Sequence, residues 1–327
     1  MTAIAQTANP TQNRAETFRD EITAKLIELL EQVDPKDWKL PWHRAGTIFG
    51  INNPLCPLNA TTRNRYNGIN WLVLALASGL DATGPKYTSA RFATYLQWQQ
   101  AGFQVRAGSH GLPIVKVGTF NRKDKPTESR LSGEDESKAG KYLKVYTVFS
   151  AEQVEGTDAP MPAPVLSEAD RLAGVEAFAC ATKADIRVGG DRACCSTNKI
   201  TGESFISMPA FDRFTGVEAY YGTLLHELIH WTGLPTGRSA RIGEMFDDLG
   251  ERYAFEELVA ELGSAMLCGE LQVSNEPRPD HAAYLASWLQ GLRNDKAYIM
   301  RAAAQAQQAV QHLMTITGRA PAIEEAG

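Results

Sequence analysis

The spacing of apolar side chains predicts where the chain is helical. Apolar residues recur every three or four positions between residues 14 and 33, at Phe18, Ile22, Leu26, Leu29, Leu30 and Val33. This spacing places them on one face of an amphipathic helix. Similar spacing predicts helices over about 88–101, 216–233, 253–262, 279–293 and 296–317. Short runs rich in apolar and β-branched residues predict strands over 112–117 and 142–149.

A proline-rich stretch divides the chain into two halves. Residues 156–164 contain three prolines within five positions and have neither a helix nor a strand period. Such a composition is typical of a short extended linker. A chain of 327 residues is long enough for two domains with proper cores. We therefore expect a first domain over 1–155, a linker over 156–166 and a second domain over 167–327.

The two halves carry opposite charge. Residues 1–150 hold 19 Lys and Arg against 13 Asp and Glu, whereas residues 151–327 hold 14 against 25. A basic half favours a polyanion such as nucleic acid as its partner, and the acidic half gives no such reason. The net charge of −5 for the whole chain conceals this asymmetry.

Cysteine usage and hydropathy indicate the compartment. The five cysteines are an odd number without a Cys-x-x-Cys pair, which argues against a disulfide framework and against a structural zinc knuckle. We expect free thiols, including Cys194 and Cys195 in a strand. The longest apolar run, 71–77, is too short to cross a bilayer. The N-terminus lacks the basic and apolar regions of a secretory signal. The sequence therefore predicts a cytoplasmic protein with no membrane partner.

The most informative motif is His-Glu-x-x-His at positions 226–230, inside the predicted helix 216–233. Imidazoles four positions apart share a helix face, so His226 and His230 can bind one metal ion. Glu227, beside the first ligand, is placed to accept a proton from a metal-bound water. This arrangement is typical of a metallopeptidase. The alternative is a pair of histidines on a polar helix face without a metal.

A peptidase metal site needs a third protein ligand and one open position. In the pattern HExxHxxGxxH this ligand would fall at position 236, which is Thr, so that subclass is excluded. The predicted helix 253–262 carries Glu257 and Glu261 on one face. We predict Glu257 as the ligand and Glu261 as the carboxylate that accepts a hydrogen bond from a ligand imidazole. Asp247 and Asp248 are the reserve candidates for the ligand.

The basic half contains residue types that suit single-stranded nucleic acid. Cations bind phosphates and flat rings stack on bases. Residues 57–71 form a probable loop in which such groups lie close together, and two more follow in the predicted helix 88–101 and after it. The candidate DNA-binding residues are Arg63, Arg65, Tyr66, Trp71, Trp98 and Arg106. Buried aromatic packing is the alternative for the aromatic members.

Several segments together resemble ArdC-type antirestriction proteins. In the first half these are 57–61 (Pro-Leu-Asn-Ala-Thr), 66–70 (Tyr-Asn-Gly-Ile-Asn), 105–111 and 148–156; in the second half they are 226–233, 253–263 and 284–289. The resemblance covers nearly the whole chain in order. It departs from the family in the loop 234–241 and at Cys194-Cys195.

The resemblance implies a fold, a metal site and a role. It implies an α+β protein with a small mixed domain that binds single-stranded DNA, followed by a mainly helical zincin-like domain of the gluzincin type with a small sheet. Carried over by motif, the metal ligands fall on His226, His230 and Glu257 and the base on Glu227. The expected cofactor is a divalent ion, Zn²⁺ before Mn²⁺. In such a fold, strand 204–208 is expected as an edge that pairs with an extended substrate. The oxyanion partner is open among Tyr253, Tyr220 and His281.

Three functions remain open at this point. The first is an antirestriction protein of a plasmid or other mobile element, which shields incoming DNA from host restriction by DNA binding, by proteolysis of a host protein, or by both. The second is a regulatory metallopeptidase that cleaves a DNA-bound repressor. The third is a non-enzymatic DNA-binding module with a structural metal, whose removal would unfold the second half.

Overall fold

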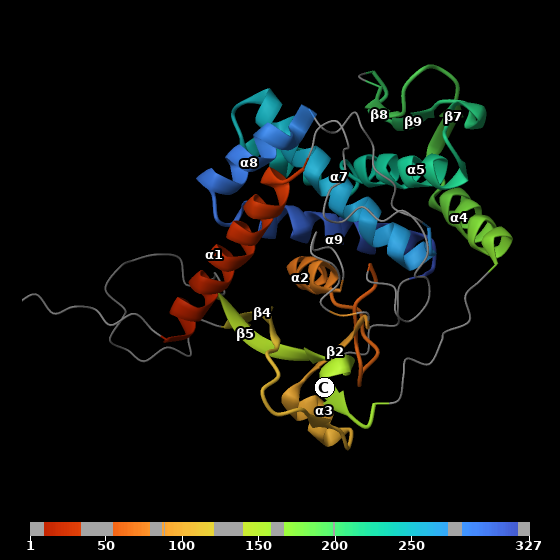
Figure 1. The fold of residues 1–327 in the computed structure, drawn as a ribbon. Coiled ribbons are helices and arrows are strands. Elements are labelled where there is room, and N and C mark those ends of the chain that lie inside the picture. Colours follow the sequence, from red (N-terminus) through yellow and green to blue (C-terminus); the bar gives the residue numbers. More distant parts are fainter. Residues whose placement is uncertain are drawn as a thin grey trace, which may run out of the picture.

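The computed structural model describes residues 10–33, 55–78, 87, 89–120, 140–157, 167–198, 200–273 and 283–319 (Figure 1). In chain order its helices are α1 (Pro10–Glu31), α2 (Ile69–Ala77), α3 (Tyr95–Gln100), α4 (Glu168–Thr182), α5 (Val217–Trp231), α6 (Arg238–Met245), α7 (Leu249–Leu271), α8 (Leu285–Asn294) and α9 (Tyr298–Ile316). Its strands are β1 (Leu58–Asn59), β2 (Arg91–Thr94), β3 (Gln104–Val105), β4 (Leu112–Phe120), β5 (Gly140–Ser150), β6 (Val154–Glu155), β7 (Asp185–Val188), β8 (Cys194–Thr197) and β9 (Ser204–Met208).

The first half is built on a sheet with the strand order β1-β2-β5-β4. Strands β4 and β5 pair antiparallel from Leu112↔Val148 to Phe120↔Gly140, which confirms both predicted strands. The helix predicted over 88–101 is wrong in its first part, because residues 91–94 form β2 with Phe92 fully buried. Thr94 and Gln97 then form a reciprocal capping box, and this starts the short helix α3.

The helices of the first half pack on those of the second. Helix α1 contacts both β5 and α8, and α2 contacts both β4 and α9 (Figure 1). One continuous hydrophobic core therefore includes Leu26, Leu72, Leu258 and Leu313. At Gly269 of α7, an added Cβ would lie 2.5 Å from the carbonyl oxygen of Leu55, so the backbone of the first half rests directly on this helix. The predicted domain bounds stay predictions, since residues 158–166 lie outside the described part of the chain.

The second half combines a small sheet with long helices. Its strand order is β7-β9-β8, with β9 parallel to β7 and antiparallel to β8. Helix α5 lies between this sheet and α7 and contacts both. At Gly263 of α7, an added Cβ would lie 2.8 Å from Cδ1 of Ile229, so glycine permits α5 and α7 to approach closely. The α+β fold class, with a mainly helical second half and a small sheet, is confirmed.

Within the described residues, none of the helices has both the length and the apolar run that a membrane span requires.

Candidate metal centre

Helix α5 carries the histidine motif, and its local sequence explains where the helix ends. Its buried face includes Leu225, Leu228 and Ile229, which pack into the core. After Trp231, the hydroxyl of Thr232 donates to the carbonyl of Ile229 at 2.6 Å. This bond satisfies one of the carbonyls that a helix leaves free at its C-terminus. The predicted helix 216–233 therefore matches α5 closely.

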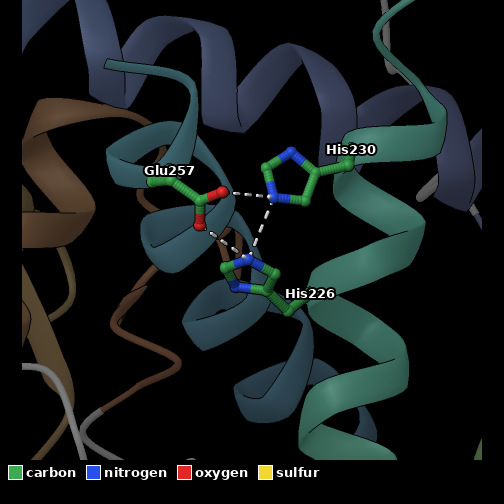
Figure 2. A group of neighbouring side chains, drawn as sticks. All are labelled: His226, His230 and Glu257. Carbon is green, nitrogen blue, oxygen red and sulfur yellow. Dashed lines mark hydrogen bonds and ion pairs between the residues drawn. The ribbon is translucent and has the colours of Figure 1, made fainter. Parts of the chain in front are cut away.

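Three predicted metal ligands meet between α5 and α7. His226 and His230 project from α5, Glu257 projects from α7, and their polar atoms face one another (Figure 2). The Nε2 atoms of the histidines lie 3.0 Å apart. The carboxylate oxygens of Glu257 lie 3.4 Å from Nε2 of His226 and 3.6 Å from Nε2 of His230.

The two separations between Glu257 and the histidines suit one tetrahedral ion, and the two Nε2 atoms, 3.0 Å apart, would move slightly apart to bind it. Metal–ligand bonds of about 2.0–2.2 Å place the ligand atoms of a tetrahedron about 3.3–3.6 Å apart. His226 is 2% and Glu257 5% exposed, so the ligands are largely held away from water. Two imidazoles and one carboxylate also match the donor set of catalytic zinc sites with an open position. The residues present therefore fit a divalent cation.

A buried arginine and a second glutamate hold one of the histidines. Nδ1 of His230 lies 3.0 Å from Oε1 of Glu256. Arg238, which is 1% exposed, donates from Nη2 to Oε1 and from Nε to Oε2 of the same carboxylate, at 2.6 and 2.9 Å. It also donates to the carbonyl of Ile229 and to the hydroxyl of Thr232. Arg238 therefore links the end of α5 to α7 and fixes the ring orientation of His230.

Sequence reasoning missed both of these groups. We predicted Glu261 for the contact with a ligand imidazole, but the carboxylate that makes this contact to His230 is Glu256. Glu261 is buried one turn beyond Glu257, and its role stays a prediction. The adjacent pair Glu256-Glu257 was the available signal. Arg238 is the first residue of α6, within the stretch 234–241 that departs from the family pattern, and nothing in the sequence indicated its burial.

The neighbouring charges shift the pKa values of the centre. Burial lowers the pKa of His230, but the hydrogen bonds to Glu256 and Glu257 outweigh it and raise the pKa to about 10. Burial raises the pKa of Glu257, but the hydrogen bonds to His226 and His230 outweigh it and hold the pKa well below its usual range. Without a metal, the carboxylate is therefore charged and His230 is protonated at neutral pH.

The centre opens into a cavity of about 420 Å³, which Glu227 also lines. Glu227 is 3% exposed, so its carboxylate is shielded from bulk water. Cys195 lines the same cavity. Burial and then the charge of Glu227 raise the pKa of its thiol to about 12, so this cysteine is no nucleophile at neutral pH. All five cysteines are free.

The edge strand beside the cavity is not the one that the sequence indicated. Strand β9 (204–208) is central in its sheet, with partners on both sides. Strand β8 is the edge, and its residues Cys194, Cys195 and Thr197 line the cavity. The expectation for 204–208 is therefore wrong, because a central strand has no free backbone groups for a substrate.

The remaining candidates near the centre differ in whether they line the cavity. Asp248 caps α7 by accepting from the backbone N–H of Glu251 at 2.9 Å, and neither it nor Asp247 joins the ligand group. Tyr253 lines the cavity. Tyr220 packs among Phe211, Phe214 and Tyr221 and is not part of the cavity wall. His281 lies outside the described residues.

The structure divides the predicted DNA-binding residues. Trp71 and Trp98 are each 3% exposed. Their indole N–H groups donate to the carbonyls of Leu55 and Phe149, at 2.7 and 3.1 Å. Neither ring has a face open to a base, so both are excluded as DNA-binding residues. The hydroxyl of Tyr66 donates to the carbonyl of Phe92 at 3.1 Å, and burial raises its pKa to about 12. This ring is therefore structural too.

The arginines predicted to bind DNA are more exposed than the predicted aromatic residues. Arg63 and Arg106 are exposed, although Arg106 donates to the backbone carbonyl of Glu152. Nε of Arg65 lies 3.0 Å from Oε1 of Glu270 on α7, so this arginine already has a partner in the second half. Arg91, which the sequence did not indicate, has a buried Nε without a hydrogen-bond partner. Burial and then the charge of Arg63 lower its pKa.

Two asparagines in the segments 57–61 and 66–70 have structural roles. Oδ1 of Asn59 accepts from the backbone N–H groups of Thr61 and Thr62, and this fixes the turn that follows β1. Asn70 pairs with the backbone of Val115 on β4: its amide donates to the carbonyl at 2.7 Å, and its Oδ1 accepts from the N–H at 2.8 Å. The side chain therefore satisfies the open edge of the sheet.

Family models match both halves of the chain. A model of the N-terminal domain of anti-restriction factor ArdC matches residues 16–149, and a model of a zincin-like metallopeptidase matches residues 173–305. The chain is 35% identical over 293 residues to the uncharacterized protein y4eC of Sinorhizobium fredii, which covers 88% of this chain and 89% of that protein. It is 33% identical over 307 residues to a DNA primase TraC of Escherichia coli, of which it spans 26%.

Two solved structures are similar over nearly their full length. The metal-free crystal structure of antirestriction ArdC protein from the R388 plasmid has a TM-score of 0.68 at 32% identity, covering 93% of this chain and 98% of that one. The Mn(II)-bound structure of the same protein has a TM-score of 0.66 at 32% identity, covering 91% and 97%. Both domains and their order are therefore shared.

Proposed function

We propose, since the chain belongs to the ArdC family of antirestriction proteins, that it binds single-stranded DNA with its first half and protects incoming DNA of a mobile element from host restriction. The second half carries a divalent metal centre for peptide hydrolysis. The observation that carries this proposal is the meeting of His226, His230 and Glu257 beside Glu227 in one cavity.

The metal would be held by Nε2 of both histidines and by the carboxylate of Glu257. A relative of known structure has been solved with Mn(II), which supports Mn²⁺ beside Zn²⁺ as the resident ion. When bound, the ion would act as a Lewis acid toward water and a peptide carbonyl. Arg238 and Glu256 keep Nδ1 of His230 as a hydrogen-bond donor, so Nε2 is the nitrogen left for the ion.

Glu227 is the proposed general base. Its carboxylate lines the cavity next to the ligands without belonging to the ligand group. It can therefore accept the proton of the attacking water and then donate it to the leaving amine. Tyr253, which lines the same cavity, is the candidate for hydrogen bonding to the developing oxyanion.

Cations of the first half would bind the DNA backbone. Arg63 and Arg91 lie near enough for one to shift the pKa of the other, and neither has a carboxylate partner among the described residues. A phosphate between two guanidinium groups would relieve their repulsion. This pair and the exposed Arg106 therefore form the proposed contact with the phosphates of single-stranded DNA.

The test compares Glu227→Gln with wild type in two assays. The control is Glu244→Gln, which removes an exposed carboxylate outside the cavity wall. Fluorescent single-stranded and double-stranded oligonucleotides are titrated across a salt series, and metal content is measured on the same samples. We expect wild type and both variants to prefer single strands, with affinity falling as salt rises, and to retain metal. Absence of single-strand binding by wild type would contradict the DNA-binding proposal.

Protection of DNA from restriction in cells then shows whether peptide hydrolysis or DNA binding is responsible for it. If protection depends on hydrolysis, Glu227→Gln loses it while Glu244→Gln retains it. If protection depends on DNA binding alone, both variants retain it, and the proteolytic route is excluded. Loss of metal from Glu227→Gln would contradict the assignment of Glu227 as a base outside the ligand set.

A further inference from the structure

The cavity at the metal centre extends along α6 to the start of α7. Beyond His230, its wall is formed by the apolar side chains of Leu234, Ile242 and Leu249 and then by Arg252. Arg252 lies four positions before Glu256, so its side chain leaves α7 one turn away from the glutamate that holds His230. A cation therefore lies on the wall of the same cavity, about one helical turn from the glutamate that orients His230.

The guanidinium of Arg252 keeps free donors. Its Nε donates to the carbonyl of Phe246 at 2.6 Å, which anchors the side chain. Among the described residues, no carboxylate pairs with its two Nη groups. A Cβ added at Gly243 of α6 would lie 3.7 Å from Nη1, so the guanidinium faces a position without a side chain. Four N–H groups in a planar fork are thus available to a ligand.

A second arginine, Arg192, also lines the cavity. Arg192 precedes the edge strand β8, is exposed, and has no ion-pair partner among the described residues. The carboxylates that line the cavity are all assigned: Glu256 pairs with Arg238, Glu257 faces the two histidines, and Glu227 is the proposed base. Asp247 and Asp248 are not part of the wall. The charged side chains of the cavity that have neither a partner nor an assigned role are therefore Arg192 and Arg252, although residues 151–327 are acidic overall.

We propose that this cavity selects an extended polypeptide with an acidic side chain beside the bond to be cleaved, and that Arg252 binds that carboxylate. This inference rests on the proposed metal centre. The free edge of β8 can pair with the backbone of an extended chain, and the apolar wall suits the stem of a Glu side chain. A planar fork binds a carboxylate with two parallel hydrogen bonds. Arg192, which lines the same cavity, adds a favourable charge for a second acidic residue of the substrate.

The test uses peptides that end in a metal-binding hydroxamate. Full-length protein loaded with Mn²⁺ is titrated with three hydroxamate peptides that differ only in the adjacent residue, which is Glu, Gln or Lys. Acetohydroxamate measures the metal centre alone. We expect Glu to bind about tenfold to hundredfold more tightly than Gln, because the added hydrogen bonds involve charged groups. The Lys peptide should bind more weakly than the Gln peptide.

Three variants test whether Arg252 is responsible for the preference for Glu over Gln. Arg252→Gln should abolish the preference for Glu over Gln and leave acetohydroxamate binding unchanged. Arg252→Lys retains the charge and should keep part of the preference, which guards against misfolding of the Gln variant. The control is Arg241→Gln, which removes a positive charge from α6 outside the cavity wall and should change nothing.

Each contrary result overturns a different statement. Acetohydroxamate binding without a preference for Glu overturns the inference and leaves the metal centre standing. No acetohydroxamate binding overturns the metal centre and the inference together. Displacement of the peptides by a short oligonucleotide, lost in Arg252→Gln, would assign Arg252 to phosphates of DNA and overturn its role with peptides.

Discussion

The metal centre and the segment 57–71 differ in how far their chemistry follows from local sequence. Two histidines four positions apart must share a helix face, so the motif nearly determines the separation of their nitrogen atoms. The segment 57–71, expected as a loop, contains β1 and the start of α2. Its cations and rings are equally close along the chain, yet Trp71 is buried in α2 and Arg65 pairs with Glu270. Closeness along the sequence predicts a site only where the secondary structure fixes which of the neighbouring side chains point in the same direction.

The two regions also depend on different neighbours. The metal centre depends on Arg238, which crosslinks α5 and α7 from within the core. The segment 57–71 depends on α7 as a packing surface, because Arg65 pairs with Glu270 and the preceding Leu55 rests on Gly269. Although α7 supports both regions, they contact it through different residues, so substitutions can be chosen that affect one region and leave the other intact.

Arg238→Leu should have the largest effect, and it should fall on the metal centre. The substitution leaves the Glu256 carboxylate partly buried without its partner, which costs about 3–5 kcal/mol of the free energy of unfolding. Loss of a partner that orients a ligand also weakens metal binding by about 10–100-fold. Thermal unfolding and metal titration measure the two effects. Arg213→Leu is the matched control, because its pair with Asp191 is exposed and contributes about 0–1 kcal/mol. Equal destabilisation by both variants would contradict the structural role of Arg238.

Trp71→Phe tests whether this ring belongs to the fold or to DNA. Phenylalanine can still stack on a base, but it cannot donate to the buried carbonyl of Leu55. We expect a loss of about 1–3 kcal/mol in the free energy of unfolding, the cost of an unsatisfied buried group. Affinity for single-stranded DNA, measured where the variant is fully folded, should not change. Unchanged stability with weaker DNA binding would return Trp71 to the DNA surface.

Metal binding should strengthen as pH rises. Because the pKa of metal-free His230 is raised to about 10, the imidazole is protonated below that pH and must lose a proton to bind the ion. The affinity should therefore increase by about tenfold per pH unit between pH 6 and pH 8. Calorimetry in buffers of different ionisation enthalpy counts the released protons.

Glu256→Gln is the control for this pH dependence. The amide keeps a hydrogen-bond acceptor for His230 but removes the charge of Glu256, one of the two carboxylates that raise its pKa. The increase of affinity with pH should then level off at a lower pH than in wild type. A metal affinity that does not vary with pH in the wild-type protein would contradict a protonated His230.

The same contrast explains how much of the molecule could be predicted from its sequence. Strand and helix periods predicted α1, α5, β4 and β5, because one face of each element is buried. The pattern predicts a helix over residues 91–94, because their apolar positions suit either structure, and only the capping box of Thr94 and Gln97 marks where the helix begins. Arg238 could not be predicted, because its burial depends on contacts with Glu256 and Ile229, which come from different elements.

Arg63→Gln should have the smallest effect, and it completes the comparison. Arg63 is exposed in the turn after β1, so its substitution should change the free energy of unfolding by less than about 0.5 kcal/mol. If Arg63 and Arg91 share a phosphate, the variant should weaken binding to all single-stranded sequences alike. It should also reduce the slope of log affinity against log salt by about one phosphate contact, or about 0.7. Arg65→Gln is the informative control: its partner is Glu270, so it should lower stability and leave the salt slope unchanged. An unchanged slope in Arg63→Gln would remove the last residue of the segment 57–71 from the DNA surface and shift the search to Arg106.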